Sequence, residues 1–361
     1  MARWSPGTKQ AIEMHTDSPS TPILSRPGPS RRFCVAPMMD WSDRHYRYFA
    51  RLISRRALLY TEMVTTGAVI HGERSRFLGY NAEEQPLALQ LGGSNPAELA
   101  TCAALAEEAG FAEVNLNVGC PSDRVQNNMI GACLMAHPKL VAEGVRAMHQ
   151  TCSVPVTVKH RIGINGHDSY AQLCDFVGQV QEAGCETFIV HARIAILEGL
   201  SPKENRDIPP LRYEVVQQLK RDFPQLEIII NGGLTNLDVM TEQLKTLDGV
   251  MVGREAYHNP YLLAEVDQRF YGDTHTAPDR LEVMAAMRPY IARHMANGGV
   301  MNHVTRHMLG LFQGLPGARH FRRQLSSAIH QTSDPLALYD QLLTDMSERQ
   351  QAGLLRAAGI R

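Results

Sequence analysis

Cys120 is the residue whose type and position best suit chemistry. It lies in the turn Gly119-Cys120-Pro121, outside the helix interiors in which structural cysteines are usually buried. Because an unperturbed thiol has a pKa of about 8.5, it is mostly protonated at neutral pH and suits the role of a general acid. Five other cysteines fit better as small buried apolar side chains, namely Cys34, Cys102, Cys152, Cys174 and Cys185.

A lysine, an amide and an imidazole each follow a short apolar run. Lys159 would either form a Schiff base with a carbonyl substrate or stand as a fixed cation beside an electron-rich ring. A flavin gains electron density at its pyrimidine edge on reduction, and Gln90 and His191 are side chains of the kind that hold such an edge. A flavin on one face of a uracil would deliver hydride to carbon 6, and Cys120 on the other face would protonate carbon 5 of the resulting enolate.

Glycines follow two further apolar runs, in Asn231-Gly232-Gly233 and in Gly253-Arg254. Glycine lets backbone N–H groups approach a phosphate closely, and an arginine adds charge-assisted hydrogen bonds, so the two segments predict a phosphate site. No Gly-x-Gly-x-x-Gly follows the first strand, which leaves a Rossmann dinucleotide site without support. The seven cysteines form no Cys-x-x-Cys pair, so we expect no disulfide framework and no metal centre.

These residues must be positioned by a repeated strand–helix unit. Short apolar runs alternate with longer amphipathic ones, which is typical of βα units around a parallel sheet. Eight units predict an α/β fold, a (β/α)8 TIM barrel whose chemistry lies at the carboxyl ends of the strands, with an open doubly wound sheet as the alternative. The expected strands are Phe33–Ala36, Leu58–Thr61, Leu87–Gln90, Glu113–Leu116, Val154–Val158, Thr187–Val190, Glu227–Ile230 and Gly249–Val252, and helices between them include Pro96–Ala109 and Ser169–Ala183.

The chain divides into three parts. Residues 1–31 contain too little apolar material to offset the entropy of ordering, so we expect a disordered extension. Residues 32–275 hold the barrel, and residues 280–361 form a small helical domain without strand candidates. Its expected helices include Leu281–Ala296, Asn302–Phe312 and Ala318–His330. No apolar run is long enough to span a membrane.

The helical domain carries an uneven charge. The net charge of the chain is −1, yet no acidic residue occurs between Glu282 and Asp334, where five histidines and six arginines fall. Such a run is either an ordinary solvated helix face or a surface that faces phosphates, and the lack of carboxylates favours the second interpretation. The arginines are Arg288, Arg293, Arg306, Arg319, Arg322 and Arg323.

Taken together, these segments resemble the tRNA-dihydrouridine synthases of subfamily A. The resemblance runs from about Phe33 to Arg323 and is strongest in the Asn-x-Asn-x-Gly-Cys-Pro segment, Asn115–Ser122. The segment Gly199–Arg206 indicates the subfamily. Other similar segments are Val35–Trp41, Leu59–Met63, Leu89–Gly93 and Asp248–Arg254. At Ile194 and Ile196 the chain departs from the family, which often has lysine and tryptophan there.

The resemblance implies a flavoenzyme that reduces D-loop uridines 20 and 20a of tRNA to 5,6-dihydrouridine, with NADPH or NADH as electron donor, FMN as hydride donor and Cys120 as proton donor. It also implies a cytoplasmic protein without membrane partners, and we expect a monomer. The implied FMN contacts are Pro37, Met38, Met39, Gln90, Lys159, His191, Asn231, Gly232, Gly233, Gly253 and Arg254. The implied tRNA contacts are Asn117, Lys203, Arg206, Arg319 and Arg322.

Three other functions stay open. The nearest is a small-molecule flavin reductase of the dihydroorotate dehydrogenase-like type, which would act on free pyrimidines and would not need the arginine-rich run. A non-catalytic tRNA-binding module would purify without a flavin. An aldolase would form a Schiff base on Lys159 that borohydride traps.

Overall fold

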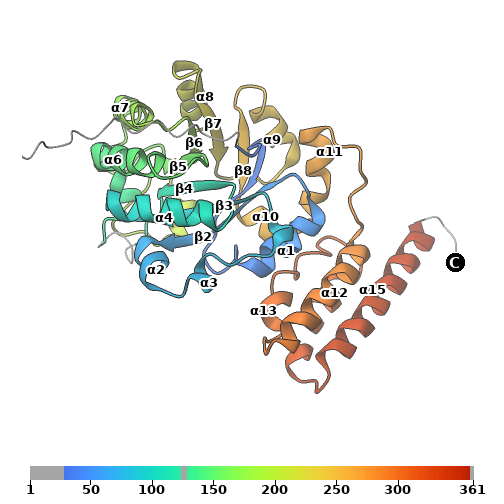
Figure 1. The fold of residues 1–361 in the computed structure, drawn as a ribbon. Coiled ribbons are helices and arrows are strands. Elements are labelled where there is room, and N and C mark those ends of the chain that lie inside the picture. The colour runs from blue at the N-terminus through green and yellow to red at the C-terminus, as the bar shows by residue number, and fades with distance from the viewer. Residues whose placement is uncertain (1–27, 123–127, 358–361) are drawn as a thin grey trace, which may run out of the picture.

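The computed structural model describes residues 28–122 and 128–357. Eight parallel strands, paired in chain order with the last against the first, close into a barrel surrounded by helices (Figure 1). This confirms the (β/α)8 barrel and excludes the open sheet. The strands are β1 (Phe33–Val35), β2 (Leu58–Thr65), β3 (Leu87–Gly92), β4 (Glu113–Val118), β5 (Val156–Arg161), β6 (Thr187–His191), β7 (Glu227–Asn231) and β8 (Gly249–Val252).

Two of the predicted outer helices begin at residues whose side chains accept from their first N–H groups. The predicted helices α4 (Pro96–Glu108) and α7 (Tyr170–Glu182) are confirmed, and their N-caps are Asn95 and Ser169. Ser169 and Gln172 form a capping box, which fixes the start of α7. The other helices of this layer are α1 (Arg44–Ile53), α2 (Thr66–His71), α3 (Arg74–Phe77), α6 (Pro138–His149), α8 (Tyr213–Asp222), α9 (Leu237–Gln243), α10 (Arg254–His258) and α11 (Val266–Tyr271).

The inside of the barrel is apolar on one side and polar on the other. Side chains alternate between the two faces of a strand, and one buried apolar cluster inside the barrel includes Tyr60, Ile189 and Met251. In β4, as in the other strands, the apolar residues pack outward against the helices, but the residues that face inward are polar. The buried inward-facing residues of β4 are Glu113, Asn115 and Asn117.

An arginine closes the floor of the barrel, the end at which the strands begin. Arg31 is buried, and its guanidinium forms ion pairs of 2.6 Å with Glu113 and 2.7 Å with Glu227. Burial opposes the charge of Arg31, but the two carboxylates raise its pKa above the ordinary value. The predicted disordered extension otherwise falls on residues 1–27, which lie outside the described residues.

The helices after the barrel lie together on one side of it, next to α1 and α10 (Figure 1). They are α12 (Arg280–Ala296), α13 (Asn302–Thr305), α14 (Ala318–Ser326) and α15 (Pro335–Ala357), and α12 packs against both α1 and α15. Of the described helices, none is long and apolar enough to cross a membrane.

One predicted helix of this part is wrong in extent. The expected helix Asn302–Phe312 stops at Thr305, and turns follow up to α14. Here the chain runs against the barrel so closely that a Cβ at Gly310 would lie 2.2 Å from the carbonyl oxygen of His258. Contact with the barrel therefore overrides the helical pattern. The predicted helix Ala318–His330 is also divided, into α14 and a 3-10 turn at Ala328–His330.

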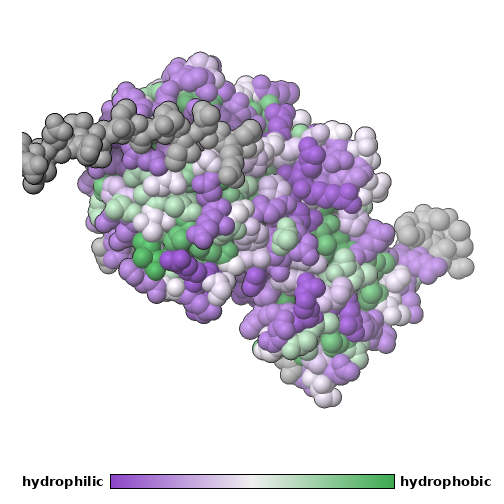
Figure 2. Space-filling view, in the orientation of Figure 1, coloured by the Kyte–Doolittle hydropathy of each residue, from purple (hydrophilic) through white to green (hydrophobic). Residues whose placement is uncertain are grey.

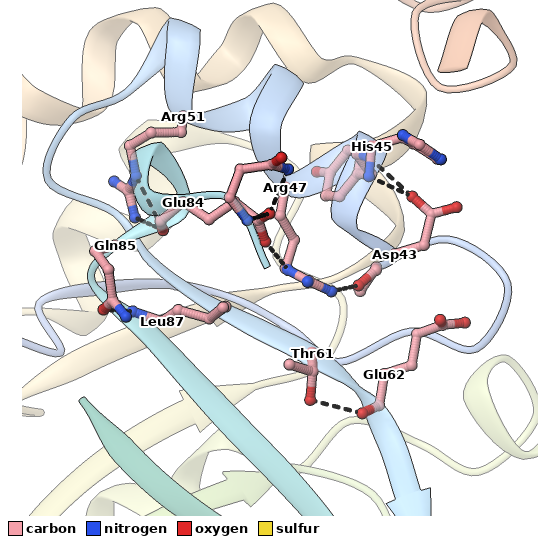
Figure 3. A network of polar contacts seen from close by, with 12 residues as sticks. Asp43, His45, Arg47, Arg51, Thr61, Glu62, Glu84, Gln85 and Leu87 are labelled. Carbon is pink, nitrogen blue, oxygen red and sulfur yellow. Dashed lines mark hydrogen bonds and ion pairs between the residues drawn. The ribbon is translucent and has the colours of Figure 1, made fainter. Parts of the chain in front are cut away.

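Ion pairs fix α1 against the barrel and against the helical domain. Arg47 donates to Glu84 at 2.5 Å and to the carbonyl oxygen of Ser42 at 2.7 Å, which ties α1 to the segment before β3 (Figure 3). Asp43, at the start of α1, accepts hydrogen bonds from Arg306 at 2.7 Å and His307 at 3.0 Å. Burial opposes the charge of Asp43, but the bonds from His307 and Arg306 hold its pKa below the ordinary range.

On the face of the molecule in Figure 2, hydrophilic residues cover most of the barrel and of the helices that follow it. Apolar residues form only small areas between them. Among the described residues, four large apolar side chains are clearly exposed: Met39, Ile208, Val239 and Val300.

Candidate active site

Strand register brings the predicted residues to one rim, the carboxyl end of the barrel. Asn117 of β4 pairs with Lys159 of β5, and His191 of β6 pairs with Asn231 of β7. Gln90 lies in β3, the neighbour of β4. Residues spread over more than a hundred positions of the chain therefore meet at the end of a TIM barrel where ligands bind.

Hydrogen bonds hold the loop of Cys120 from two sides. The side-chain oxygen of Asn117 accepts from the backbone N–H of Gly119 at 3.0 Å and of Cys120 at 2.9 Å. On the other side, the N–H of Ala132 donates to the carbonyl oxygen of Cys120 at 2.8 Å. Gly131 makes this approach possible, since its φ is 85° and a Cβ there would lie 2.4 Å from that oxygen. The partly exposed thiol of Cys120 thus comes from a fixed backbone.

Arg161 is a residue to which the sequence argument assigned no role. It is buried, and its guanidinium donates to the carbonyl oxygens of Gly119 at 2.9 Å, Ile194 at 2.9 Å and Asn205 at 3.0 Å. It therefore ties the Cys120 loop to the loop after β6. Its spacing of two residues from Lys159 in one strand was an available signal, because such residues share a face.

The rim is strongly cationic. Burial, helped by the charge of Arg161, lowers the pKa of Lys159 to about 7, although Cys120 acts in the opposite direction. Within residues 28–122 and 128–357, no ion pair or hydrogen bond engages the Lys159 ammonium. Arg193, Arg206 and Arg254 add further positive charge around the same loops. A partly buried cation among arginines suits an anionic ligand.

His191 is neutral and lacks a partner on one nitrogen. Its ring is buried, and Nδ1 has no hydrogen-bond partner in the described structure. Burial, together with the charges of Arg161 and Lys159, holds the pKa of His191 well below its ordinary value. A buried polar atom without a partner is costly, so its position at the rim indicates a ligand that supplies the missing hydrogen bond.

Asn117 and Gln90 form one hydrogen-bonded unit. The side-chain N–H of Asn117 donates to the side-chain oxygen of Gln90 at 2.8 Å, and both residues are buried. Asn117 was predicted to contact tRNA. In the structure both ends of its amide engage the barrel and the Cys120 loop. Its contact with any ligand would therefore come from a side chain that is already fixed.

The predicted phosphate segments have the backbone that close approach requires. Gly232 and Gly233 have φ of 113° and 66°, and a Cβ at Gly233 would lie 2.4 Å from the side chain of Leu211. The hydroxyl of Tyr213 fixes this turn by donating to the carbonyl oxygen of Gly232 at 2.7 Å. Next to it, Asn231 donates to the carbonyl oxygen of Met251 at 2.8 Å.

Arg254 follows Gly253 at the end of β8, beside these glycines. Its guanidinium pairs at 2.8 Å with Asp207, which lies in the loop after β6. In that arrangement Arg254 joins two rim loops. A phosphate in the glycine turn would compete with the exposed Asp207 carboxylate for the same guanidinium.

The loop after β1 supplies apolar surface to the rim. The N–H of Met38 donates to the hydroxyl of Ser42 at 3.0 Å, and this fixes the turn after Pro37. Met39 is 57% exposed, and Ile208, in the loop after β6, is 60% exposed. Exposed apolar side chains at a polar rim suit contact with a planar ring or a nucleobase.

The loop that carries Lys203 and Arg206 is organised by one buried amide. Asn205 accepts from the N–H of Ile196 at 2.8 Å and donates to its carbonyl oxygen at 2.8 Å. Both Lys203 and Arg206 are exposed on this loop. Ile194 bonds to Arg161 and Ile196 bonds to Asn205 through backbone atoms alone. The departure of their side chains from the family pattern therefore leaves these bonds of the loop intact.

Arg319 and Arg322 lie three residues apart on α14, and both are exposed. Side chains at this spacing share one helix face. No ion pair involves either of them in the described part of the chain. The run without carboxylates is partly neutralised in space by acidic residues distant in sequence, in the pairs Arg288–Asp340, Arg306–Asp43 and His320–Asp345.

The comparison with known proteins decides the family. Residues 34–349 match the family model described as dihydrouridine synthase (Dus). The chain belongs to the dihydrouridine synthase family. It is 68% identical over 328 residues to the tRNA-dihydrouridine(20/20a) synthase of Pseudomonas putida, covering 91% of this chain and 98% of that protein. The proteins of the same name from Shewanella oneidensis and Escherichia coli K12 are 61% and 58% identical, covering 88% and 89% of this chain and 95% and 93% of theirs. The predicted resemblance is confirmed.

Proposed function

We propose that this protein reduces uridine to 5,6-dihydrouridine in the D-loop of tRNA, at positions 20 and 20a. Relatives up to 68% identical over most of the chain have names that state this substrate. The observation in the structure that carries the proposal is the fixed Cys120 loop, whose thiol lies within electrostatic reach of the rim cations Lys159 and Arg161.

FMN fits the residues at the rim. Lys159 and the unpartnered Nδ1 of His191 provide a cation and a polar atom that need a ligand, and the glycine turns suit the phosphate. We assign the cofactor to Pro37, Met38, Met39, Gln90, Lys159, His191, Asn231, Gly232, Gly233, Gly253 and Arg254. When bound, FMN, reduced by NADPH or NADH, supplies the hydride for carbon 6 of the uracil ring.

The chain's own residues supply the proton and the positioning. Cys120 donates its thiol proton to carbon 5, and Asn117 holds the loop from which the thiol acts. Lys159 and its neighbouring arginines keep the rim positive while negative charge develops on the uracil carbonyl. Arg161 keeps the Cys120 loop at a fixed distance from the loop after β6.

The substrate is a tRNA whose target base leaves the stack and enters the barrel rim. Lys203 and Arg206 contact the nucleotides next to the target base, and Arg319 and Arg322 of α14 contact the backbone further away. A cytoplasmic, monomeric enzyme goes with this substrate.

The test compares the wild-type protein with Cys120→Ala. Both are expected to purify with a flavin that NADPH bleaches, and only the wild type should convert uridine in an unmodified tRNA transcript, which mass spectrometry detects as a gain of two hydrogens. Losses of about 100-fold or more are expected for removal of a general acid. Equal activity of the two proteins on tRNA would refute the role of Cys120. Activity on free pyrimidines but not on tRNA would favour a small-molecule flavin reductase.

A further inference from the structure

A chain of hydrogen bonds runs through the interior of the barrel from its floor to the Cys120 loop. Starting at the floor, the hydroxyl of Thr157 donates to Glu113 at 2.6 Å, and the side-chain N–H of Asn115 donates to the Thr157 oxygen at 2.8 Å. The side-chain N–H of Gln90 then donates to the Asn115 oxygen at 2.7 Å, and that of Asn117 to the Gln90 oxygen at 2.8 Å.

Every link of this chain lies in the barrel wall and is shielded from water. Glu113, Asn115 and Asn117 are alternate residues of β4, while Gln90 and Thr157 pair with Asn115 from the strands on either side. Glu113, Asn115 and Thr157 are fully buried, and Gln90 and Asn117 are nearly so. In such surroundings hydrogen bonds polarise one another, and an unmade bond is not replaced by water.

The direction of the chain is determined at both ends. The Glu113 carboxylate, which forms an ion pair with Arg31, acts as an acceptor, so Thr157 donates to it and accepts from the N–H of Asn115. At the rim, the backbone N–H groups of Gly119 and Cys120 can only donate, so the side-chain oxygen of Asn117 must face them. Both ends require the same orientation of the three amides between them.

Two further contacts hold the Glu113 carboxylate at the floor of the barrel. Arg31 pairs with one carboxylate oxygen at 2.6 Å, and the hydroxyl of Tyr60 donates to the other at 2.6 Å, alongside Thr157. Arg31 also pairs with Glu227, whose carboxylate accepts from Thr187 at 2.8 Å. The carboxylate is thus fixed in position and supplied only with donors.

We propose that Glu113 is a positioning residue, which through Thr157 and Asn115 fixes the amide orientation of Gln90 and Asn117 and thereby holds the Cys120 loop. This rests on the proposed function, in which Gln90 contacts the flavin and Cys120 donates the proton. Glu113 at the floor of the barrel thereby fixes which way the Gln90 amide points at the rim. The second N–H and the second lone pair of Gln90 then lie at fixed positions for a ligand.

Glu113→Gln removes the acceptor at the floor of the barrel while keeping the size of the side chain. Arg31 only donates, so it selects the amide oxygen of the new side chain and turns the NH₂ group toward Thr157. Thr157 then accepts from both sides through its two lone pairs, and its own O–H loses the acceptor that Glu113 supplied, so the floor of the barrel no longer sets the direction of the chain. Thr157→Val breaks the same chain at its second link, and Thr157→Ser keeps the hydroxyl and serves as the matched control.

The experiment compares these variants as purified FMN-loaded proteins in three measurements. The first is the absorbance spectrum of the bound flavin, and the second is the rate of Cys120 alkylation by iodoacetamide, followed by peptide mapping. The third is kcat and KM for tRNA. Glu113→Gln and Thr157→Val are expected to shift the flavin spectrum, to change the alkylation rate of Cys120 and to lower kcat about 10- to 100-fold, with a smaller effect on KM. Thr157→Ser should restore the wild-type behaviour.

Wild-type spectrum, alkylation and kcat in Thr157→Val would overturn the proposal. So would equal losses in Thr157→Val and Thr157→Ser, because the hydroxyl would then not matter. If Glu113→Gln does not fold, the two Thr157 variants decide alone. If the wild type does not act on tRNA, the proposed function fails, but the alkylation and spectrum measurements still test the hydrogen-bond chain.

Discussion

The guanidinium of Arg161 donates a hydrogen bond of 2.9 Å to the carbonyl oxygen of Gly119, the residue directly before Cys120. The same side chain reaches Ile194 and Asn205 in the loop after β6. One buried cation thus joins the loop of the proposed proton donor to the loop that carries Lys203 and Arg206. If tRNA contacts the second loop, as proposed, that contact is linked to the position of the thiol.

Arg161→Met should lower kcat on tRNA by about 100-fold while the protein still binds FMN, because three carbonyl oxygens lose their donor and the Cys120 loop loosens. The expected loss of stability is about 1–3 kcal/mol. Stopped-flow oxidation of the reduced flavin by tRNA measures the chemical step, and thermal unfolding measures stability. Arg161→Lys keeps the charge without the three-way geometry and should restore only part of the rate. Full activity of Arg161→Met would contradict the role of this residue.

FMN binding by the apoprotein should take up a proton above neutral pH. The pKa of Lys159 is lowered from 10.5 to about 7, so at higher pH the free protein carries a neutral amine. An anionic ligand beside it would raise this pKa, and the amine would take up a proton from the solvent. Affinity for FMN should therefore fall as pH rises above about 7, by at most about tenfold per unit. Calorimetry at pH about 8.5 in two buffers of different ionisation enthalpy measures the uptake. Lys159→Met should bind FMN more weakly and without proton uptake. Proton uptake that persists in this variant would assign the proton to another group.

The sequence was sufficient for the fold and for the position of the rim, because both follow from local patterns. Alternation of apolar runs with amphipathic segments gave eight strands, and the polar residues at their ends, from Gln90 to Arg254, could fall only on one end of a parallel barrel. In contrast, the helix expected at Asn302–Phe312 was shortened by contact with the barrel at Gly310, which no local pattern contains.

The connections between side chains could not be predicted in the same way. Arg161 and Glu113 have functions that depend on partners 42 to 82 residues away, such as Gly119 and Arg31. Likewise, the sequence between Glu282 and Asp334 has no acidic residue, yet Asp340 and Asp43 form ion pairs with arginines of this segment in the folded protein. A residue's type and spacing give its face on a strand, but its hydrogen-bond partners follow from the closed barrel.

Acid should destabilise the protein partly through His45 of α1, whose ring bonds to Tyr290 of α12. Burial lowers the pKa of His45 from 6.5 to about 4; the charge of Asp43 opposes this shift, and His294 and His307 add smaller lowering effects. Between these two pH values the unfolded chain binds a proton that the folded chain does not, so stability falls as the pH falls from about 6.5 toward 4. The slope for one proton is at most about 1.4 kcal/mol per pH unit. His45→Gln, which can still bond to Tyr290, should reduce this slope in denaturant unfolding; an unchanged slope would refute the assignment.

Neutralising Arg319 and Arg322 should weaken tRNA binding and also make it less dependent on salt. Both guanidinium groups are exposed on one face of α14 and have no ion pair among the described residues, so they remain available for phosphates. Each lost phosphate contact removes about 0.7–0.9 from the slope of log K against log salt, so the double glutamine variant should lose about 1.5. Arg288→Gln is the matched control, because it removes the same charge from the same domain, but its guanidinium is already paired with Asp340 at 2.8 and 3.0 Å. If all arginines acted only through net charge, Arg288→Gln would reduce the slope half as much as the double variant. If α14 carries a specific contact surface, the salt slope of Arg288→Gln should equal that of the wild type. Turnover at saturating tRNA should be preserved in both variants.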